Sequence, residues 1–221
     1  MIREAVQALV LKMGYVVERA TKHYAGMEGF DPLYRRCQPY TMTSKENMFA
    51  LYKTTEYLIR HGIPGDFVEC GVWKGGSAMV MALSLLQVGV TDRQLFLYDT
   101  YAGMSEPTSK DVNVHGARAG FIWNRMRRNG FNAFNFSPEE VVRRNLRSTG
   151  YPEARITFVK GLVEETIPHI VPDRIALLRL DTDWYESTYH ELRHLFPRLS
   201  PGGGLVVDDY GYWKGAREAT D

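Results

Sequence analysis

Apolar residues recur along this chain in two alternating patterns, which predict strands and helices in turn. Short apolar runs, typical of strands buried on both faces, occur at 66–71, 94–98, 156–159, 175–180 and 205–207. Apolar positions at helical spacing predict helices over 78–86, 137–150, 163–167 and 189–199. This alternation predicts an α/β fold with a mostly parallel, doubly wound sheet.

The N-terminal part, residues 1–62, is predicted to be a helical segment of the same domain, and residues 63–221 to form its core. Apolar positions at helical spacing predict an amphipathic helix over 1–24, packed on the domain or on a second subunit of a homo-oligomer. A second helix is predicted to be capped by Thr43 or Ser44 and to run to about residue 60.

Glycine, proline and serine mark several predicted boundaries. The run Ser200-Pro201-Gly202-Gly203-Gly204 is predicted to stop a helix before the last strand. Ser137 is predicted to cap the helix that follows it, with Pro138 as the first helical residue. Residues 102–136 show little clean periodicity, so we expect a long excursion that could close over a site.

Composition narrows the range of partners. The chain has 27 Lys and Arg against 26 Asp and Glu, a net charge of +1, which does not favour nucleic-acid binding. It has two cysteines, Cys37 and Cys70, too few for a disulfide framework or a zinc cluster, and this fits a reducing cytoplasm. No stretch is long and apolar enough to span a membrane. Small-molecule chemistry is therefore the favoured class.

The segment after the first strand is typical of a ligand-binding turn. A strand, a glycine turn with Gly71 and Gly75, and a helix follow one another, so that backbone can approach a ligand closely. Trp73 stands where a dinucleotide-binding turn needs glycine, which disfavours NAD and FAD. Glu69 at the end of the strand suits a compact ligand with an ammonium group. A tight turn without any ligand remains the alternative.

Asp99 ends the second strand, where nucleotide-binding sheets place an acid on the ribose hydroxyls. This position favours an adenosyl ligand. The alternative is that Asp99 merely starts a turn, as aspartate does at many strand ends.

Three further carboxylates follow the ends of two later strands. Asp181 follows one apolar run, and Asp208 and Asp209 follow the next. If these strands are neighbours, the acids emerge together at the carboxyl edge of the sheet, where they would repel one another without a cation. An all-oxygen site suits Mg²⁺. The alternative is a pair of capped turns.

Four motifs occur in order at 69–77, 99–104, 181–188 and 208–211: ECGVWKGGS, DTYAGM, DTDWYEST and DDYG. Together they resemble the macrocin O-methyltransferase family. The resemblance implies a Rossmann-like class I methyltransferase that uses S-adenosylmethionine and Mg²⁺ to methylate sugar hydroxyls of macrolide and aminocoumarin antibiotics. The expected acceptor is therefore a small-molecule hydroxyl, on a sugar or a diol.

The resemblance also implies roles for individual residues. Those that match the cofactor site are Glu69, Gly71, Gly75, Ser77 and Asp99. Those that match the metal ligands are Asp181, Asp208 and Asp209. Asp181 is also placed to act as the base, and Asp183 is a weaker candidate that could lie beside the cofactor. Apart from the resemblance, His190 is a candidate base if Asp181 proves to be a replaceable ligand.

One departure from the family concerns the end of the sequence. A class I sheet normally continues past its fifth strand through one more helix and two further strands, whereas this sequence stops at Asp221, within a helical stretch. We therefore expect the antiparallel edge strands to be missing. Two functions stay open: an O-methyltransferase, or a non-catalytic or truncated relative that keeps the fold for cofactor binding or assembly.

Overall fold

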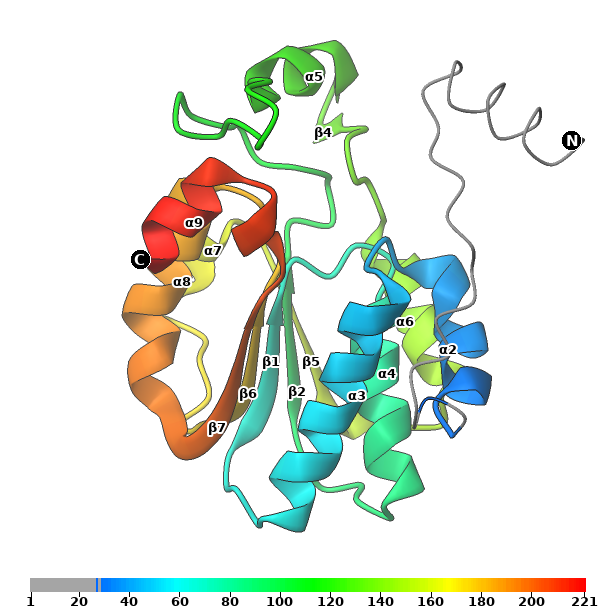
Figure 1. Ribbon diagram of the computed structural model, residues 1–221. Coiled ribbons are helices and arrows are strands. Elements are labelled where there is room, and N and C mark those ends of the chain that lie inside the picture. Colours follow the sequence, from blue (N-terminus) through cyan, green and yellow to red (C-terminus); the bar gives the residue numbers. More distant parts are fainter. Residues whose placement is uncertain (1–26, 28) are drawn as a thin grey trace, which may run out of the picture.

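A five-stranded parallel sheet forms the centre of the protein (Figure 1). The computed structural model describes residue 27 and residues 29–221, so the helix predicted over 1–24 lies outside the described residues. The strands are β1 (Asp66–Cys70), β2 (Leu95–Asp99), β5 (Ile156–Lys160), β6 (Ile175–Leu180) and β7 (Leu199–Val207). Their order is β5-β2-β1-β6-β7, and each neighbouring pair is parallel. The predicted α/β class is confirmed.

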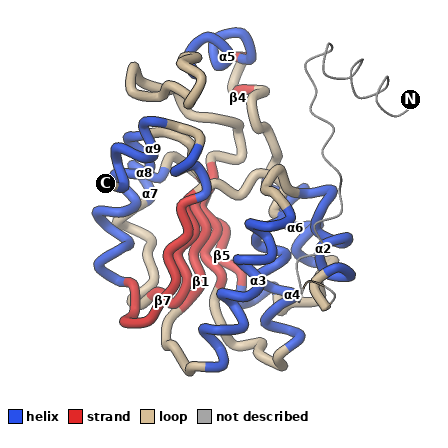
Figure 2. Tube along the Cα trace, in the orientation of Figure 1, coloured by secondary structure: helices blue, strands red, loops and turns tan. Residues whose placement is uncertain are grey.

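Helices cover both faces of this sheet, which makes it doubly wound (Figures 1 and 2). One face carries α2 (Asp31–Cys37), α3 (Lys45–Arg60), α4 (Gly76–Gln87) and α6 (Glu139–Arg147). The other carries α7 (Val163–Thr166), α8 (Tyr185–Leu195) and α9 (Lys214–Thr220). A separate apolar cluster fills the space under each layer. Among the described helices, none is both long and apolar enough to cross a membrane.

The alternation of side chains along the strands assigns residues to the two clusters. Phe67 and Leu177 belong to the cluster under α3 and α4, whereas Val68 and Leu178 belong to the cluster under α8. Because successive strand residues point to opposite faces, every residue of β6 is buried on one side or the other. This explains the nearly continuous apolar run that predicted the strand.

Helix α3 begins where the sequence predicted. Ser44 is the N-cap, and its hydroxyl accepts a hydrogen bond from the Asn47 amide at 3.2 Å, so Ser44 rather than Thr43 caps the helix. The predicted excursion over 102–136 contains α5 (Ala119–Met126) and a small hairpin of β3 (Arg127–Arg128) and β4 (Phe131–Asn132). In Figure 1 this segment lies beyond the carboxyl ends of the central strands.

The predicted helix over 189–199 was wrong at both ends. Helix α8 begins at Tyr185, and a 3₁₀ turn over Phe196–Arg198 separates it from β7. Its first turn contains Ser187 and Thr188, which are buried although they are polar. Burial of polar side chains leaves no trace in a hydrophobic pattern, so the start of the helix was missed.

Two boundary predictions based on serine and glycine were also wrong. Ser137 does not cap α6: Pro138 is the N-cap residue, and the buried Ser137 hydroxyl has no hydrogen-bond partner. The glycine run does not precede the last strand but lies inside β7, where Gly204 pairs with Leu177. A Cβ on Gly204 would lie 2.7 Å from the Thr54 methyl group, so glycine here lets α3 pack closely on the strand.

Candidate functional site

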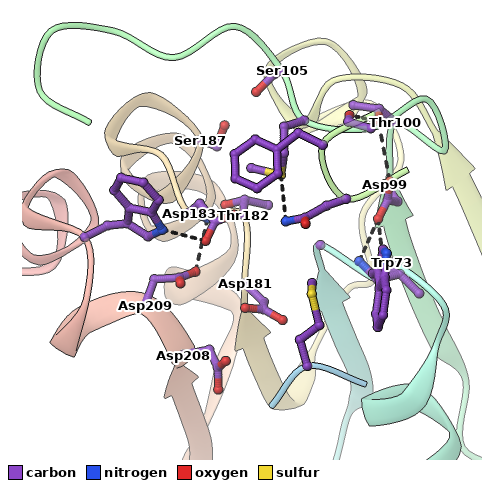
Figure 3. A pocket seen from close by; sticks show the side chains of 18 of the residues that line it. Trp73, Asp99, Thr100, Ser105, Asp181, Thr182, Asp183, Ser187, Asp208 and Asp209 are labelled. Atoms are coloured by element: carbon purple, nitrogen blue, oxygen red, sulfur yellow. Dashed lines mark hydrogen bonds between the residues drawn. The ribbon is translucent and has the colours of Figure 1, made fainter. Parts of the chain in front are cut away.

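A cavity of about 960 Å³ lies at the carboxyl ends of the strands. The chain proceeds from β1 outward to β2 and β5, then returns to the other side of β1 with β6 and β7. The strand order therefore reverses between β1 and β6, which is where open α/β sheets bind ligands. The turn after β1 borders one side of the cavity, and the acids after β6 and β7 border the other (Figure 3).

Glycines shape the turn between β1 and α4. Gly71 has φ +82°, and a Cβ there would lie 2.0 Å from the Asp181 carbonyl oxygen. Gly75, the N-cap of α4, has φ +86°, and its Cβ would meet Leu146 at 2.9 Å. Both positions combine a left-handed backbone with close packing, so only glycine fits. The predicted glycine turn between a strand and a helix is present, and Gly71 also allows β1 and β6 to end side by side.

Asp99 holds this turn in place from the end of β2. One carboxylate oxygen, Oδ2, accepts hydrogen bonds from the Val72 and Trp73 amides at 2.7 and 2.9 Å (Figure 3). The other, Oδ1, accepts one from the Tyr101 amide at 2.7 Å. Burial raises the pKa of Asp99, while these amide hydrogen bonds lower it. Asp99 lines the cavity, and these three hydrogen bonds to its carboxylate come from backbone amides. Its predicted contact with a ribose stays a prediction.

Glu69 presents an unpaired oxygen among the residues that line the cavity. Its side chain is 1% exposed, Oε1 accepts a hydrogen bond from Arg179 at 2.7 Å, and Oε2 is buried without any partner. Burial raises its pKa to about 7 against the opposing effect of Arg179. A buried oxygen without a donor is what a ligand ammonium group would satisfy. Ser77, the other predicted side chain here, is buried, and its hydroxyl lies 3.5 Å from the Met48 sulfur.

The acids of the opposite side do come together, as predicted from neighbouring strands. Asp181, Asp183, Asp208 and Asp209 all line the cavity (Figure 3). Burial and the charges of Asp208 and Asp209 raise the pKa of Asp181 well above its usual range, although Arg179 opposes this. These acids therefore repel one another, and the positive charge of Arg179 offsets this repulsion only in part.

Arg179 supplies a cation that the sequence analysis did not foresee. Its guanidinium is fully buried, donates to Asp181 Oδ2 at 2.7 Å and lies 3.4 Å from Asp208 Oδ1. A signal was present, because an arginine inside an otherwise apolar strand must find buried negative partners. The run Ile175–Leu180 contained that arginine two residues before an aspartate.

Asp209 faces a different neighbour. Its Oδ2 accepts a hydrogen bond from the Asp183 amide at 3.1 Å, and Asp183 Oδ1 accepts one from the Trp213 indole at 2.8 Å (Figure 3). Burial raises the pKa of Asp183 to about 7 and that of Asp209 well above its usual range. The structure thus groups the acids as two sets, one around Arg179 and one around Asp183.

The three predicted metal ligands fit Mg²⁺ in chemistry, because all of them are carboxylates with mutual repulsion to relieve. In the arrangement described for residues 29–221, however, no three His, Cys, Asp or Glu side chains form a group that could hold an ion, so these carboxylates would have to draw together to bind one. No described histidine lines the cavity, and His190 Nε2 lies 2.8 Å from the Ile167 carbonyl oxygen instead. His190 is therefore not placed to act as a base.

The predicted excursion borders the cavity. Phe121 and Ile122 of α5 line it although both side chains are largely exposed, and Phe134 lines it from the following loop. Trp184, which is 2% exposed, donates its indole hydrogen bond to the Ser105 carbonyl at 3.0 Å and ties the excursion to the start of α8. An acceptor would meet apolar side chains here.

Comparisons with known proteins agree with this fold. Residues 16–221 match the macrocin-O-methyltransferase (TylF) family. The 8-demethyl-8-(2,3-dimethoxy-alpha-L-rhamnosyl)-tetracenomycin-C 4'-O-methyltransferase of Streptomyces olivaceus is 36% identical over 171 residues, 77% of this chain and 62% of that protein. The demethyldecarbamoylnovobiocin O-methyltransferase of Streptomyces niveus is 34% identical over 182 residues, 82% of this chain and 66% of that protein. The chain thus spans slightly under two thirds of these relatives.

A solved structure is also similar. The O-methyltransferase NovP superposes with a TM-score of 0.71 at 32% identity, covering 82% of this chain and 72% of that chain. The calicheamicin methyltransferase CalS11, with a TM-score of 0.58 at 18% identity over 94% of this chain and 86% of that chain, shows a likeness of fold alone. From the family match across 16–221 and these relatives, the chain belongs to the macrocin-O-methyltransferase family.

Proposed function

We propose that the protein transfers a methyl group from S-adenosylmethionine to a hydroxyl of a small-molecule acceptor, a sugar or diol of a natural product, with the help of Mg²⁺. The observation that carries the proposal is one cavity with two chemically different sides. A glycine turn with an unpaired Glu69 oxygen faces a group of four aspartates. Membership of the family supports the same activity.

The cofactor belongs on the side of the glycine turn. Glu69 Oε2 would accept a hydrogen bond from the ammonium group of its methionine portion, and Gly71 and Gly75 leave room for close approach to the backbone. Ser77 and Asp99 line the same side, and Asp99 would meet the ribose while it holds the turn. When bound, S-adenosylmethionine supplies an electrophilic methyl group.

The acceptor belongs on the acidic side, where Asp181, Asp208 and Asp209 would hold Mg²⁺, an ion that favours the deprotonated form of a nearby hydroxyl. The acceptor oxygen forms its bond to the methyl carbon as the carbon–sulfur bond breaks, and the electron pair of that bond goes to sulfur. Asp181 accepts the hydroxyl proton. An efficient transfer would require the acceptor oxygen to lie in line with the methyl group, between the two sides of the cavity.

Calorimetry and turnover test the proposal together. S-adenosylhomocysteine is titrated into the full chain. Demethyldecarbamoylnovobiocin, the compound in the name of the Streptomyces niveus relative, is offered as acceptor with S-adenosylmethionine. We expect binding, and methylation that stops with a chelator and returns with Mg²⁺. Absence of S-adenosylhomocysteine binding would refute the proposal.

A different result would favour the other open function. Binding of S-adenosylhomocysteine without turnover of any hydroxyl acceptor would favour a non-catalytic relative that keeps the fold. A cytoplasmic location and assembly into homo-oligomers stay predictions, and sedimentation of the chain with and without residues 1–24 tests the second of them.

A further inference from the structure

Arg179 is a buried guanidinium that contacts both sides of the cavity. Its Nη1 donates to Glu69 Oε1 and to Asp181 Oδ2, each at 2.7 Å. Its Nη2 donates to the Thr43 hydroxyl at 3.0 Å and lies 3.4 Å from Asp208 Oδ1. The Arg179 side chain is 1% exposed, so water does not screen these contacts. One side chain therefore joins the acid of the cofactor side to two acids of the acceptor side.

The register of the sheet brings these groups together. Glu69 on β1 and Arg179 on β6 are paired residues, so their side chains point to the same face. Arg179 also pairs with Val206 on β7. Asp181 and Asp208 lie two residues beyond Arg179 and Val206, where the side-chain alternation returns them to the same side. The contact with Asp181 is thus local in sequence, whereas the contacts with Glu69 and Asp208 depend on the strand order.

The shape of a guanidinium matters in this position. Three carboxylates converge on Arg179, and a buried charge that lost its partner would be strongly destabilising. A planar guanidinium can donate to acids on two sides at once and fix their orientation, whereas a lysine ammonium is a point charge on a flexible stem. Lysine at this position would keep the positive charge but could not hold the carboxylates on both sides in fixed orientations.

We propose that Arg179 is a positioning residue, which orients Glu69 toward the cofactor and Asp181 and Asp208 toward Mg²⁺ at the same time. The proposal rests on the proposed function, because it assigns those ligands to the two sides. Arg179 itself does not line the cavity and acts through the carboxylates that do. By holding Glu69 through Oε1, it leaves Oε2 open for a ligand.

The Arg179→Lys variant of the full chain tests this proposal through two separate bindings. S-adenosylhomocysteine in chelator, and MgCl₂ alone, are titrated by calorimetry. We expect each affinity to fall about tenfold or more, as happens when partners that orient ligand side chains are lost. Arg147→Lys is the matched control, since Arg147 forms an exposed pair with Glu153 away from the cavity, and both affinities should stay at the wild-type values.

A double-mutant cycle identifies the route of the effect. In a Glu69→Gln background, Arg179→Lys should cause little further loss of S-adenosylhomocysteine affinity, because the side chain through which Arg179 acts has already changed. In the same background, the loss of Mg²⁺ affinity should persist at its full size. Additive losses of S-adenosylhomocysteine affinity would overturn the proposed route through Glu69.

The remaining outcomes are equally decisive. A folded Arg179→Lys protein with unchanged affinity for both ligands, or with a loss confined to one of them, overturns the link between the two sides. If this variant fails to fold, Thr43→Val replaces it, since the Thr43 hydroxyl accepts from Arg179 and lies 3.5 Å from Asp208 Oδ2. Because Thr43 helps to hold the guanidinium that contacts both sides, Thr43→Val should lower the affinity for Mg²⁺ and for S-adenosylhomocysteine severalfold. A loss confined to one ligand, or no loss, overturns the proposal. Wild-type protein that binds neither ligand refutes the proposed function itself.

Discussion

The two sides of the cavity are built in different ways. The glycine turn is a shape made by backbone: Gly71 and Gly75 occupy left-handed conformations, and three amides satisfy the carboxylate of Asp99. The acidic side is made of charges, and burial together with neighbouring acids raises the pKa of Asp181 and Asp209. The turn itself is fully hydrogen-bonded through Asp99, and only Glu69 Oε2 on that side lacks a donor. The acidic side instead holds repulsion that a cation would relieve.

Because of this difference, we expect substitutions on the two sides to affect different properties, stability on the glycine side and the reaction rate on the acidic side. Substitutions on the glycine side should lower the free energy of unfolding, because they disturb backbone that is closely packed and hydrogen-bonded. Substitutions of the acids should mainly slow the reaction and change stability less, since they remove mutual repulsion as well as charged partners of Arg179. The predictions that follow test this contrast from the largest effect to the smallest.

Gly71→Ala should have the largest effect. A Cβ would lie 2.0 Å from the Asp181 carbonyl oxygen in a residue with φ +82°, so β1 and β6 could not end side by side. We expect a loss of about 4 kcal/mol or more in the free energy of unfolding, measured with urea. Gly89→Ala is the control, because Gly89 also has positive φ but no atom within 4 Å, and it should cost about 1 kcal/mol. Equal losses would contradict the role of the close contact.

Asp181→Asn should affect chemistry instead. The amide can still offer an oxygen but cannot accept a proton, so we expect the turnover number to fall by about 10²–10⁴ even in excess Mg²⁺. This corresponds to roughly 3–5 kcal/mol of barrier height. The urea midpoint should change much less than in Gly71→Ala, because Arg179 keeps Glu69 and Asp208 as charged partners. Normal turnover of this variant would make Asp181 a replaceable ligand and require another base.

The pH dependence of stability should reveal the second acidic set. The pKa of Asp183 is raised from 3.8 to about 7 in the folded protein, mainly by burial, so the folded state binds the proton more tightly than the unfolded state does. Its stabilising contribution is therefore fully present below about pH 4 and is lost as the pH rises through about 7. In the wild type with chelator present, the free energy of unfolding should fall by a few kcal/mol between about pH 4 and pH 7, and urea denaturation at each pH measures this fall.

Asp183→Asn should remove much of that fall, because an amide does not ionise and its oxygen can still accept from the Trp213 indole. Asp92→Asn, at an exposed site, is the matched control and should keep the wild-type profile. Parallel profiles for the wild type and Asp183→Asn would show that Asp183 does not titrate in this range.

Asp99→Ala tests the hydrogen bonds of the glycine side. Removal of the carboxylate strands the Val72 and Trp73 amides, so affinity for S-adenosylhomocysteine should fall by roughly 1–3 kcal/mol in calorimetry. Asp99→Asn keeps one acceptor oxygen and should give an intermediate loss. Unchanged affinity in the alanine variant would count against any part for Asp99 in the cofactor site.

Ser44→Ala should have the smallest effect. The Ser44 hydroxyl caps α3, whose N-terminal region brings Asn47 Nδ2 to 3.5 Å from Asp208 Oδ1. Loss of the cap should cost about 1 kcal/mol in the free energy of unfolding. The exposed Ser109→Ala variant is the control and should be nearly neutral. The change in turnover can be expressed as a change in barrier height. If that change exceeded the loss in the free energy of unfolding, the cap would also support the acidic side.

The glycine side could be predicted from the sequence because its signals are local. Gly71, Gly75 and the buried strand before them lie within a few residues, and the need for glycine follows from backbone conformation. Asp99 was correctly placed at a strand end, but its three amide partners were not foreseen, because two of them lie 26 and 27 residues away. The start of α8 was missed because polar residues fill its buried first turn.

The acidic side shows the limit of sequence alone. Residue order determined that Asp181, Asp208 and Asp209 follow strand ends, and this was enough to predict that they would line one site. Only the order and register of the strands decided which acid meets which partner. Asp208 turns to Arg179 with Glu69 and Asp181, whereas the adjacent Asp209 turns to Asp183. Neighbouring side chains at a strand end point in different directions, so the pairing of buried charges is a property of the tertiary structure.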